Sequence, residues 1–349
     1  YALAMINEND LLLLSLLRQG VPFVNRPFDA IGEQMGLDGA DVILQIERMR
    51  KEGYLSAIRP IWDHRFFGYQ GAWAAMKFSE QSLEQKLEII GQHPGVIYMA
   101  QRDHEVNGWF YITAPGGHDL EAHVRILEKK TEAEKTLFLP IQRILKGAGE
   151  MRVFAGGVPE QVNQTAGSIK RTGETKLTLQ EIRLIRLLQE DFLLTDEPFR
   201  RMAETLAIPE SAMLHLLQGL FQKGYLKRIG ISGGSKPDSQ QDRFLVVWQI
   251  PEEKINFCVE RFADFPSVIS AGLRPAAPEF PYTVYTTVES KELETLELLI
   301  LKIADKIGHW PNRVILTVRE FRKTAIRYFP RELDAWWARW KTLADPAFI

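Results

Sequence analysis

The densest group of reactive side chains in this sequence is the stretch RDHEVNGWF, residues 102–110. It combines the guanidinium of Arg102, the imidazole of His104, the amide of Asn107 and the indole of Trp109. An imidazole transfers protons near neutral pH, a guanidinium binds carboxylates through paired hydrogen bonds, and an indole offers a flat apolar face. We expect a turn between two strands that points several of these groups to one side of a sheet. The alternative is an ordinary β-turn with solvated charges and a core tryptophan.

A weaker copy of the same surroundings occurs downstream, at residues 268–282. It keeps an arginine, Arg274, at the position that matches Arg102, but it contains no histidine. Arg274 can hold a carboxylate and Tyr282 can donate a hydrogen bond from its phenol; the alternative is a surface arginine and a packed tyrosine. This asymmetry between the two stretches is the main functional clue.

Composition limits the classes of protein to which the chain can belong. Its 349 residues are 45% hydrophobic and 25% charged, which favours two or three globular domains. A net charge of -2 gives no overall positive field for nucleic acid. The single cysteine, Cys258, excludes a disulfide framework and a thiolate metal cage, and the seven histidines form no close ligand cluster. We expect no metal site and, because the apolar run 11–17 is too short to span a bilayer, a cytoplasmic protein.

The surrounding elements occur twice in the chain. Pro27-Phe28 recurs as Pro198-Phe199, and Gly53-Tyr54-Leu55 recurs as Gly224-Tyr225-Leu226, both 171 positions later. Repetition over such a length indicates a tandem duplication of a whole module. Each copy begins with three helical patterns and a strand-like wing, typical of a winged helix-turn-helix. A β-α-β-β-α-β order follows, which predicts a ferredoxin-like sheet with helices on one face and hence an α+β fold.

These patterns divide the chain into six parts. We predict winged helices at 1–70 and 179–242, ferredoxin-like domains at 71–146 and 243–330, a linker at 147–178 and a tryptophan-rich C-terminal helix at 331–349. We place the last strand of each copy at 141–145 and 313–318. Each sheet leaves one face uncovered by its own helices, so we expect the two halves to pack as a pseudo-dimer. The tryptophans of the C-terminal helix are expected to cap a core.

Several short stretches together resemble one known family. They are Ile58–Asp63, Phe67–Tyr69, His93–Val96, Arg102–His104 with Asn107 and Trp109-Phe110, and Leu139-Pro140, followed in the second copy by Lys227–Gly230, Pro281-Tyr282, Glu320–Lys323 and Tyr328-Phe329. The chain resembles the sirohaem decarboxylases, which are built on the fold of the Lrp/AsnC regulators. In that family two dissimilar subunits pair, and some members fuse them in one polypeptide.

The resemblance implies an activity, a substrate and a partner. The family removes carboxyl groups from acetate side chains of sirohaem, giving didecarboxysirohaem on the route to haem or haem d1. It implies no required cofactor, with an iron tetrapyrrole as substrate or ligand, and a further oligomer or a partner decarboxylase subunit. Where members of the family commonly carry a histidine after the Pro-Gly-Val turn, this chain has Tyr98 and Ser270. Activity must then rest on His104 or be absent.

The candidate site combines both arguments. We expect His104 and Arg102 to be catalytic, His104 as proton donor and in reach of a haem iron, with Tyr98 as the next donor. The substrate-binding candidates are Asn107, Trp109, Arg274, Tyr282, Arg59, His64 and Lys323. For the wing residues Arg59 and His64, the alternative is a solvated position. The ligand is expected between the halves, with His104 and Arg102 facing Arg274 and Tyr282.

Two other classes of function stay open. A DNA-binding regulator needs donors at the start of its recognition helix. The two candidate helices open with acidic or apolar residues at 38–45 and 209–214, so we expect no specific DNA binding. A non-catalytic haem-binding partner protein is the other alternative, because the family's histidines are replaced.

Overall fold

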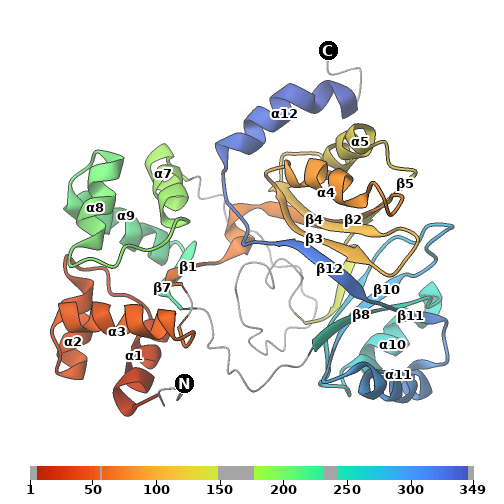
Figure 1. Ribbon diagram of the computed structural model, residues 1–349, viewed down its shortest axis with the longest axis horizontal. Helices are drawn as coiled ribbons and strands as arrows, with labels where there is room; N and C mark the ends of the chain where they lie inside the picture. Colours follow the sequence, from red (N-terminus) through yellow and green to blue (C-terminus); the bar gives the residue numbers. More distant parts are fainter. Residues whose placement is uncertain (1–5, 56, 148–176, 232–241, 345–349) are drawn as a thin grey trace.

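The computed structural model describes residues 6–55, 57–147, 177–231 and 242–344, and not the side chains of residues 64 and 65 (Figure 1). The greater part of the expected linker at 147–178 thus lies outside the described residues. Among the helices described, none is both long and apolar enough to cross a membrane. The chain forms a winged-helix part, at the left of Figure 1, and a part built on two five-stranded sheets, at the right.

The two winged helices share a two-stranded wing and one apolar core. Their elements are α1 (Glu8–Gln19), α2 (Pro27–Met35), α3 (Gly39–Lys51) and β1 (Arg59–Trp62), then α7 (Leu179–Leu188), α8 (Pro198–Leu206), α9 (Glu210–Gln222) and β7 (Leu226–Gly230). A proline at the first position of α2 and of α8 suits a helix start, where the backbone N–H has no partner to lose. Strands β1 and β7 pair antiparallel across the two copies. One apolar core therefore contains residues of both winged helices.

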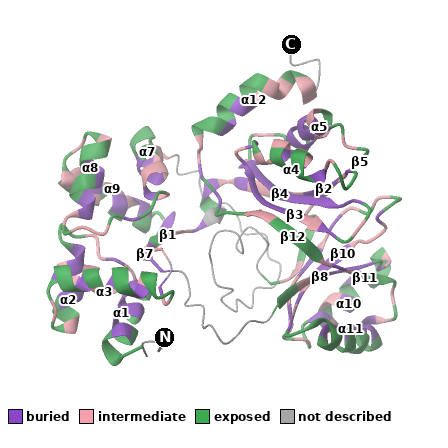
Figure 2. Cartoon of the chain, viewed as in Figure 1, coloured by how far each residue is buried: buried purple, intermediate pink, exposed green. Residues whose placement is uncertain are grey.

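The β-α-β-β-α-β order is confirmed in both halves. The first half has β2 (Tyr69–Lys77), α4 (Leu83–Gly91), β3 (Val96–Arg102), β4 (Gly108–Pro115), α5 (Leu120–Thr131) and β5 (Lys135–Pro140). The second has β8 (Asp242–Trp248), α10 (Ile255–Phe262), β9 (Val268–Leu273), β10 (Val284–Ser290), α11 (Leu293–Ile307) and β11 (Asn312–Ile315), with a 3-10 turn at Glu252–Lys254. Alternation along the strands buries one side chain in two against the helices. Along β3 and β4 burial is nearly continuous, because the other face of these strands is covered as well (Figure 2).

The last strand of each half joins the sheet of the other half. The short strands are β6 (Arg143–Lys146) and β12 (Thr317–Lys323), and the sheet orders are β12-β3-β4-β2-β5 and β11-β8-β10-β9-β6. The predicted last strands at 141–145 and 313–318 were therefore wrong. The closing strand of the first domain is β5, and the second range spans the crossing at Leu316. The sequence pattern shows which residues form a strand, but it does not show which sheet that strand joins.

The sheet faces that lack helices contribute to a shared apolar cluster. Its members from the first half include Trp109, Leu137 and Leu139, and those from the second include Phe280 and Tyr285. The fully buried indole of Trp109 lies 5.8 Å from the ring of Phe280, between ring centres. Residues of the two halves are therefore in direct contact, in addition to the exchanged strands.

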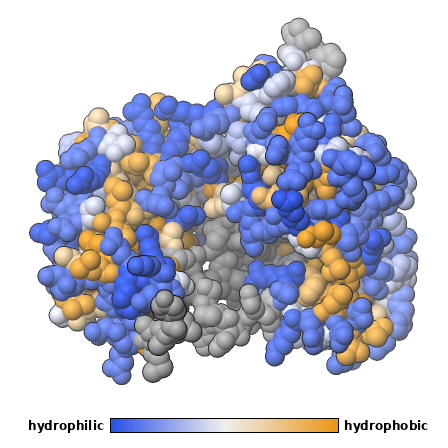
Figure 3. Space-filling view, in the orientation of Figure 1, coloured by the Kyte–Doolittle hydropathy of each residue, from blue (hydrophilic) through white to orange (hydrophobic). Residues whose placement is uncertain are grey.

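Helix α12 (Arg331–Ala344) covers the helical layer of the first half (Figure 1). Trp336 is buried in the core formed with α4 and α5, and Trp337 and Trp340 pack against that core. The expectation that this run caps a core is confirmed. The helices of the second half differ, because α11 leaves two apolar side chains, Leu298 and Leu301, largely exposed. Figure 3 shows apolar residues in this region, at the lower right, and along the winged-helix part at the left.

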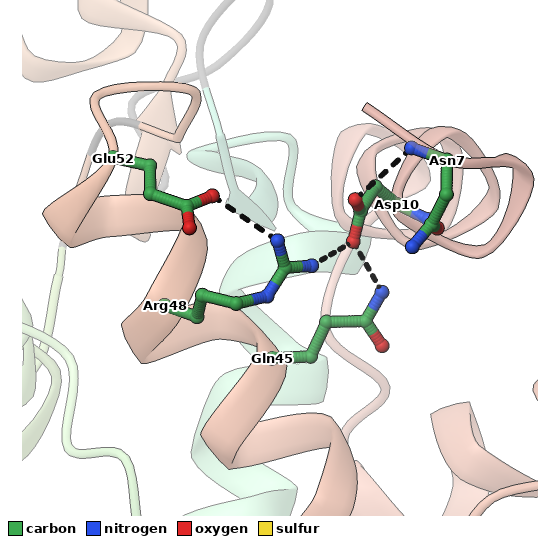
Figure 4. Close-up of polar contacts among 5 residues, drawn as sticks. All are labelled: Asn7, Asp10, Gln45, Arg48 and Glu52. Atoms are coloured by element: carbon green, nitrogen blue, oxygen red, sulfur yellow. Dashed lines mark hydrogen bonds and ion pairs between the residues drawn. The ribbon is translucent and has the colours of Figure 1, made fainter. Parts of the chain in front are cut away.

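A buried acidic side chain anchors the first helix of each copy. Asp10 closes a capping box with Asn7, accepts a hydrogen bond from Gln45 at 2.7 Å and pairs with Arg48, which also binds Glu52 (Figure 4). Burial alone would raise the pKa of Asp10, but the hydrogen bonds from Gln45 and Asn7 and the charge of Arg48 outweigh it and lower the pKa. In the second copy Glu181 occupies the matching position and accepts from Lys223 at 2.6 Å. Each buried carboxylate thus has its own cation.

Candidate functional site

The turn that follows β3 is hydrogen-bonded to the residues that connect β11 and β12. The backbone N–H of Leu316 donates to a carboxylate oxygen of Asp103 at 2.5 Å, and the N–H of Asp103 donates to the carbonyl of Leu316 at 3.2 Å. The guanidinium of Arg313 donates to the carbonyl of Asp103 at 2.8 Å. The expected strand-to-strand turn is therefore present, and the second half of the chain fixes its position.

His104 is half-buried in this turn and faces the second half. Its Nδ1 accepts a hydrogen bond from the N–H of Val106 at 3.1 Å, so the neutral ring carries its proton on Nε2. The ring packs edge-on against Phe280, with centroids 5.1 Å apart. Burial first, and then the nearby charge of Arg313, lower the pKa of His104 below its ordinary value of 6.5. His104 is therefore a neutral imidazole at neutral pH, in contact with a residue of the other half.

Arg102 and Arg274 hold the crossing strands at equivalent places. Arg102 is 9% exposed and donates to the hydroxyl of Thr317 at 2.5 Å and to the carbonyl of Ile315 at 3.4 Å. Arg274 is 1% exposed and donates to the carbonyl of Leu139. Ile315 and Leu139 stand at or next to the end of the last strand before each crossing. Both guanidinium groups are buried against backbone or side-chain acceptors of the other half, and their contact with a ligand stays a prediction.

Asn107 and Trp109 also bind their own surroundings. The amide of Asn107 donates to the carbonyl of Phe78 at 3.0 Å and accepts from its N–H at 3.1 Å. The indole N–H of Trp109 donates to the carbonyl of Val106 at 2.8 Å. The contacts of Asn107 close the turn, and Trp109 belongs to the shared apolar cluster, as a core tryptophan would.

The two candidate tyrosines occupy different surroundings. Tyr282 packs edge-on against Phe280 at 4.9 Å, so Tyr282 and His104 contact the same ring. Tyr98 is buried on β3 and packs edge-on against Trp73 at 5.4 Å. Burial raises the pKa of Tyr98, which keeps its hydroxyl protonated. The structure therefore brings together His104 and Tyr282 but not the whole set of four that we expected to share one space.

The remaining candidates lie in the wing and on an edge strand. Arg59 is exposed on β1 and lies 3.5 Å from Asp191, and this position corresponds to the solvated alternative. The side chain of His64 lies outside the described part of the chain. Lys323 is exposed at the end of β12, where its backbone pairs with that of Tyr98.

Two surface hollows lie away from all of these residues. One, of about 770 Å³, is lined by the start of α3 and by residues 194–204 around α8. The other, of about 430 Å³, lies between α11 and β11. Neither is lined by a candidate residue, and among the described residues no group of three His, Cys, Asp or Glu side chains could hold a metal ion.

Comparison with known proteins identifies the family. A family model described as "Siroheme decarboxylase NirDL-like HTH domain" matches residues 10–55 and 181–226, and one described as "AsnC-like ligand binding domain" matches 66–146 and 241–322. The NirD subunit of siroheme decarboxylase from Stutzerimonas stutzeri is 30% identical over 125 residues, which are 36% of this chain and 79% of that subunit. The chain belongs to the sirohaem decarboxylase family.

Relatives of full length support the same assignment. A siroheme decarboxylase from Hydrogenobacter thermophilus is 27% identical over 333 residues, which cover 95% of this chain and 98% of that protein. The crystal structure of the siroheme decarboxylase NirDL in complex with an iron-uroporphyrin III analogue matches with a TM-score of 0.72 at 25% identity, covering 98% of this chain and 100% of that one. Both family models match twice, so the tandem duplication and the fold class are confirmed.

In this sirohaem decarboxylase family member, a hydrogen-bonded row of three histidines was not anticipated from the sequence. His93 Nε2 lies 2.8 Å from His123 Nδ1, and His123 Nε2 lies 3.1 Å from His118 Nδ1. Trp336 and Trp337 of α12 stack on His123, with interplanar angles of 10° and 18°. Burial, then the neighbouring His118, lowers the pKa of His123 to about 4. The five-residue spacing of 118 and 123 and the distant position of 93 gave no signal of this contact.

Proposed function

We propose that this chain is a sirohaem decarboxylase, which removes carboxyl groups from acetate side chains of sirohaem to give didecarboxysirohaem on the route to haem or haem d1. The observation that carries the proposal is the end-to-end match of both duplicated modules with sirohaem decarboxylases, one of which holds an iron-uroporphyrin III analogue. The iron tetrapyrrole is the substrate.

The reaction needs a proton and a place for negative charge. Loss of carbon dioxide breaks the bond between the carboxylate carbon and the methylene carbon and leaves the electron pair on the methylene group. The conjugated ring stabilises that pair, and a proton then converts the group to methyl. A side chain that supplies this proton must approach the methylene carbon and must hold a proton in the loaded site.

His104 is the donor that the contacts support. In the free chain its depressed pKa leaves it neutral. A substrate that brings several carboxylates next to it favours the imidazolium, because a nearby negative charge raises the pKa of a histidine. His104 is then charged only when the substrate is present, and it can deliver the proton that the reaction consumes. Its contact with Phe280 gives it a fixed position relative to the second half.

Tyr98 is the second candidate donor, although its ring packs against Trp73 on the filled face of the first sheet. It stands where relatives commonly have a histidine, and its raised pKa keeps the phenol protonated over the working range. A phenol is a weaker acid than an imidazolium, so transfer from Tyr98 is slower than transfer from His104 at the same distance. The two residues occupy one strand-and-turn unit, β3 with the turn that follows.

We further propose that the two halves form the pseudo-dimer that separate subunits supply elsewhere. The beta subunit of siroheme decarboxylase from Methanosarcina barkeri is 29% identical over 147 residues, 42% of this chain and 97% of that subunit. The exchanged strands β6 and β12 and the shared cluster around Trp109 support this arrangement.

The rival regulator is poorly supported by the winged helices. The hollow beside Leu44 of the first recognition helix is lined by Asp196, Glu197 and Glu204 and also by Arg200 and Arg201. Arg200 is paired with Glu197 and Glu204, so its charge is not available to DNA phosphates. Arg26 of the first copy lies 3.5 Å from Asp196, so a nearby cation is already engaged.

The test is anaerobic incubation of the chain with sirohaem, followed by mass analysis of the tetrapyrrole. We expect loss of carbon dioxide from the acetate side chains, and we expect His104→Ala to slow this loss about 10²- to 10⁴-fold. Binding of sirohaem without any loss of carbon dioxide would instead identify a non-catalytic haem-binding partner, for which the replaced histidines at Tyr98 and Ser270 are the motivating observation.

A further inference from the structure

The two sheets carry equivalent positions with very different side chains. In the first sheet Trp73 and Tyr98 each pair with Tyr111. In the second sheet Leu245 and Ser270 each pair with Thr287. Trp73, Tyr98 and Tyr111 of the first sheet thus occupy the positions that Leu245, Ser270 and Thr287 occupy in the second sheet. Three large aromatic residues correspond to three smaller ones. All six lie on sheet faces opposite those covered by α4 and α5 or by α10 and α11.

The face of the first sheet is filled. The ring of Trp73 lies 5.4 Å from that of Tyr98 and 5.3 Å from that of Tyr111. Tyr111 is so close to Gly71 that a Cβ atom there would lie 2.6 Å from its hydroxyl. Side chains of the first half and of the winged helices share an apolar core here, so packed side chains cover this face.

A segment that follows β12 closes this face further. Tyr328 is buried, stacks on Phe67 with ring centres 4.1 Å apart and packs edge-on against Tyr69 at 5.1 Å. The backbone of the same segment is held from two sides, because Tyr69 accepts from the N–H of Phe329 at 2.5 Å and Gln189 donates to the carbonyl of Tyr328 at 3.1 Å. This aromatic plug is therefore fixed to both the sheet and α7.

Among the described residues, those at the equivalent positions of the second sheet are less buried. Leu245, Ser270 and Thr287 are each only partly buried. At its edge Ile144 of β6 is 44% exposed and pairs with Gly272, beside which the side chain of Ile141 lies. An apolar floor of this kind suits the flat face of a tetrapyrrole.

The edge of this face carries a guanidinium group, that of Arg243, which can exchange its present carboxylate partner for another. Arg243 pairs with Glu289 at 3.1 Å, and its side chain is 46% exposed. An exposed ion pair is weak, so the guanidinium is available to a substrate carboxylate. The face also adjoins the candidate turn: Leu245 pairs with Ile315, whose carbonyl accepts from Arg102, and it packs on the cluster that contains Phe280.

We infer that the chain binds a single iron tetrapyrrole, and that the macrocycle lies on the second sheet over Leu245, Ser270 and Thr287, while the first sheet's equivalent face is closed by its own aromatic side chains. This inference rests on the proposed function, because it takes the tetrapyrrole as the ligand. The two halves then have different roles: the first supplies the turn that carries His104, and the second supplies the surface on which the macrocycle lies.

Added bulk on the second face tests the inference. The probe is iron uroporphyrin III, titrated into the full chain and followed by its absorbance. We expect one macrocycle per chain, and we expect Thr287→Tyr and Ser270→Tyr each to weaken binding about tenfold or more. Thr295→Tyr, which adds the same bulk at an exposed threonine of α11, should bind as the parent does.

A second pair of variants avoids any effect of the added rings on folding. Arg243→Gln removes only the rim cation and should weaken binding about tenfold, as expected for one charge-assisted contact. Arg125→Gln, at a partly exposed cation of α5, is its control and should leave binding unchanged. Thermal unfolding of each variant shows whether it is folded.

The outcomes distinguish a failure of this inference from a failure of the proposed function. Two macrocycles per chain, or parental affinity in folded Thr287→Tyr, Ser270→Tyr and Arg243→Gln, would overturn the inference while the proposed function stands. A parent chain that neither binds iron uroporphyrin III nor decarboxylates sirohaem would overturn the proposed function and this inference with it.

Discussion

Arg274 donates a hydrogen bond to the backbone carbonyl of Leu139, across the boundary between the two halves of the chain. Arg102 makes the matching contact with the carbonyl of Ile315. Leu139 and Ile315 pair with residues of their own sheets just before the chain crosses to the other sheet. The two arginines that the sequence suggested as ligand-binding groups therefore also hold the exchanged strands in place.

The first prediction concerns stability. Arg274→Met keeps the length of the side chain but leaves the carbonyl of Leu139 without this donor, and a buried acceptor left unsatisfied costs about 1–3 kcal/mol. We expect the free energy of unfolding, measured by urea denaturation, to fall by that amount. Arg143→Met, at an exposed arginine of β6, is the control and should stay within about 0.5 kcal/mol of the parent. A variant of parental stability that has lost tetrapyrrole binding would show instead that Arg274 is a ligand residue.

The second prediction concerns the pH dependence of catalysis. A proton donor must be protonated to act, and kcat/KM reports the ionisation of the free chain. Because the pKa of His104 in the free chain lies below 6.5, we expect kcat/KM to fall as pH rises through that lowered pKa. His104→Gln should abolish this descending limb along with most of the rate, whereas His309→Gln, at an exposed histidine, should retain both. An unchanged pH profile in His104→Gln would show that His104 is not the proton donor.

The sequence was sufficient for the elements and for their duplication. Proline at the helix starts, glycine after α3 and α9, and the alternation along the strands are local signals, and they produced the winged helices and the β-α-β-β-α-β order. It was not sufficient for the exchange of β6 and β12, because a strand of four to seven residues carries the same pattern in either sheet. Pairing between sheets is decided by contacts distant in the sequence.

The site was predicted less completely than the fold. Types and spacing predicted a turn at 102–107, and the structure places His104 of that turn against Phe280 of the other half. They could not tell that Arg102, Arg274 and Asn107 satisfy backbone groups, since a buried clamp and an exposed ligand group have the same residue type. The contrast between Tyr111 and Thr287 was visible in the sequence, but it gains meaning only when the sheet registers make the two positions equivalent.

The third prediction uses the buried carboxylate of Asp10. Its pKa in the folded chain is lower than its ordinary value of 3.8, so Asp10 stabilises the fold above that value, and this contribution is lost as pH falls through the lowered pKa. Asp10→Ala removes a capping box and should cost about 1–2 kcal/mol at neutral pH. In urea denaturation, the difference between the parent and Asp10→Ala should narrow as pH falls below 3.8. Asp41→Ala, at an exposed acid of α3, serves as the control. A difference that stays constant with pH would contradict a role for the charge.

The last prediction concerns the row of histidines under α12. The pKa of His123 is lowered from 6.5 to about 4 by burial and by His118, so the unfolded chain binds a proton there at a higher pH than the folded chain. Stability must then decline as pH falls from 6.5 towards 4, because protonation favours the unfolded form. Burial and the charge of His123 lower the pKa of His93 well below 6.5 as well, and add to the same slope. The groups that face the row include Asp119, Lys130 and the two stacked tryptophans, Trp336 and Trp337.

This loss should begin at α12, since both tryptophans belong to it. We expect the tryptophan fluorescence of the parent to change between pH 6.5 and 4. His123→Phe keeps an aromatic ring between Trp336 and Trp337 but cannot take up a proton, so its change over this range should be smaller. His215→Phe, at a histidine on α9 remote from the row, should behave as the parent does. An equal acid response in the parent and in His123→Phe would mean that the histidine row does not hold α12 in place.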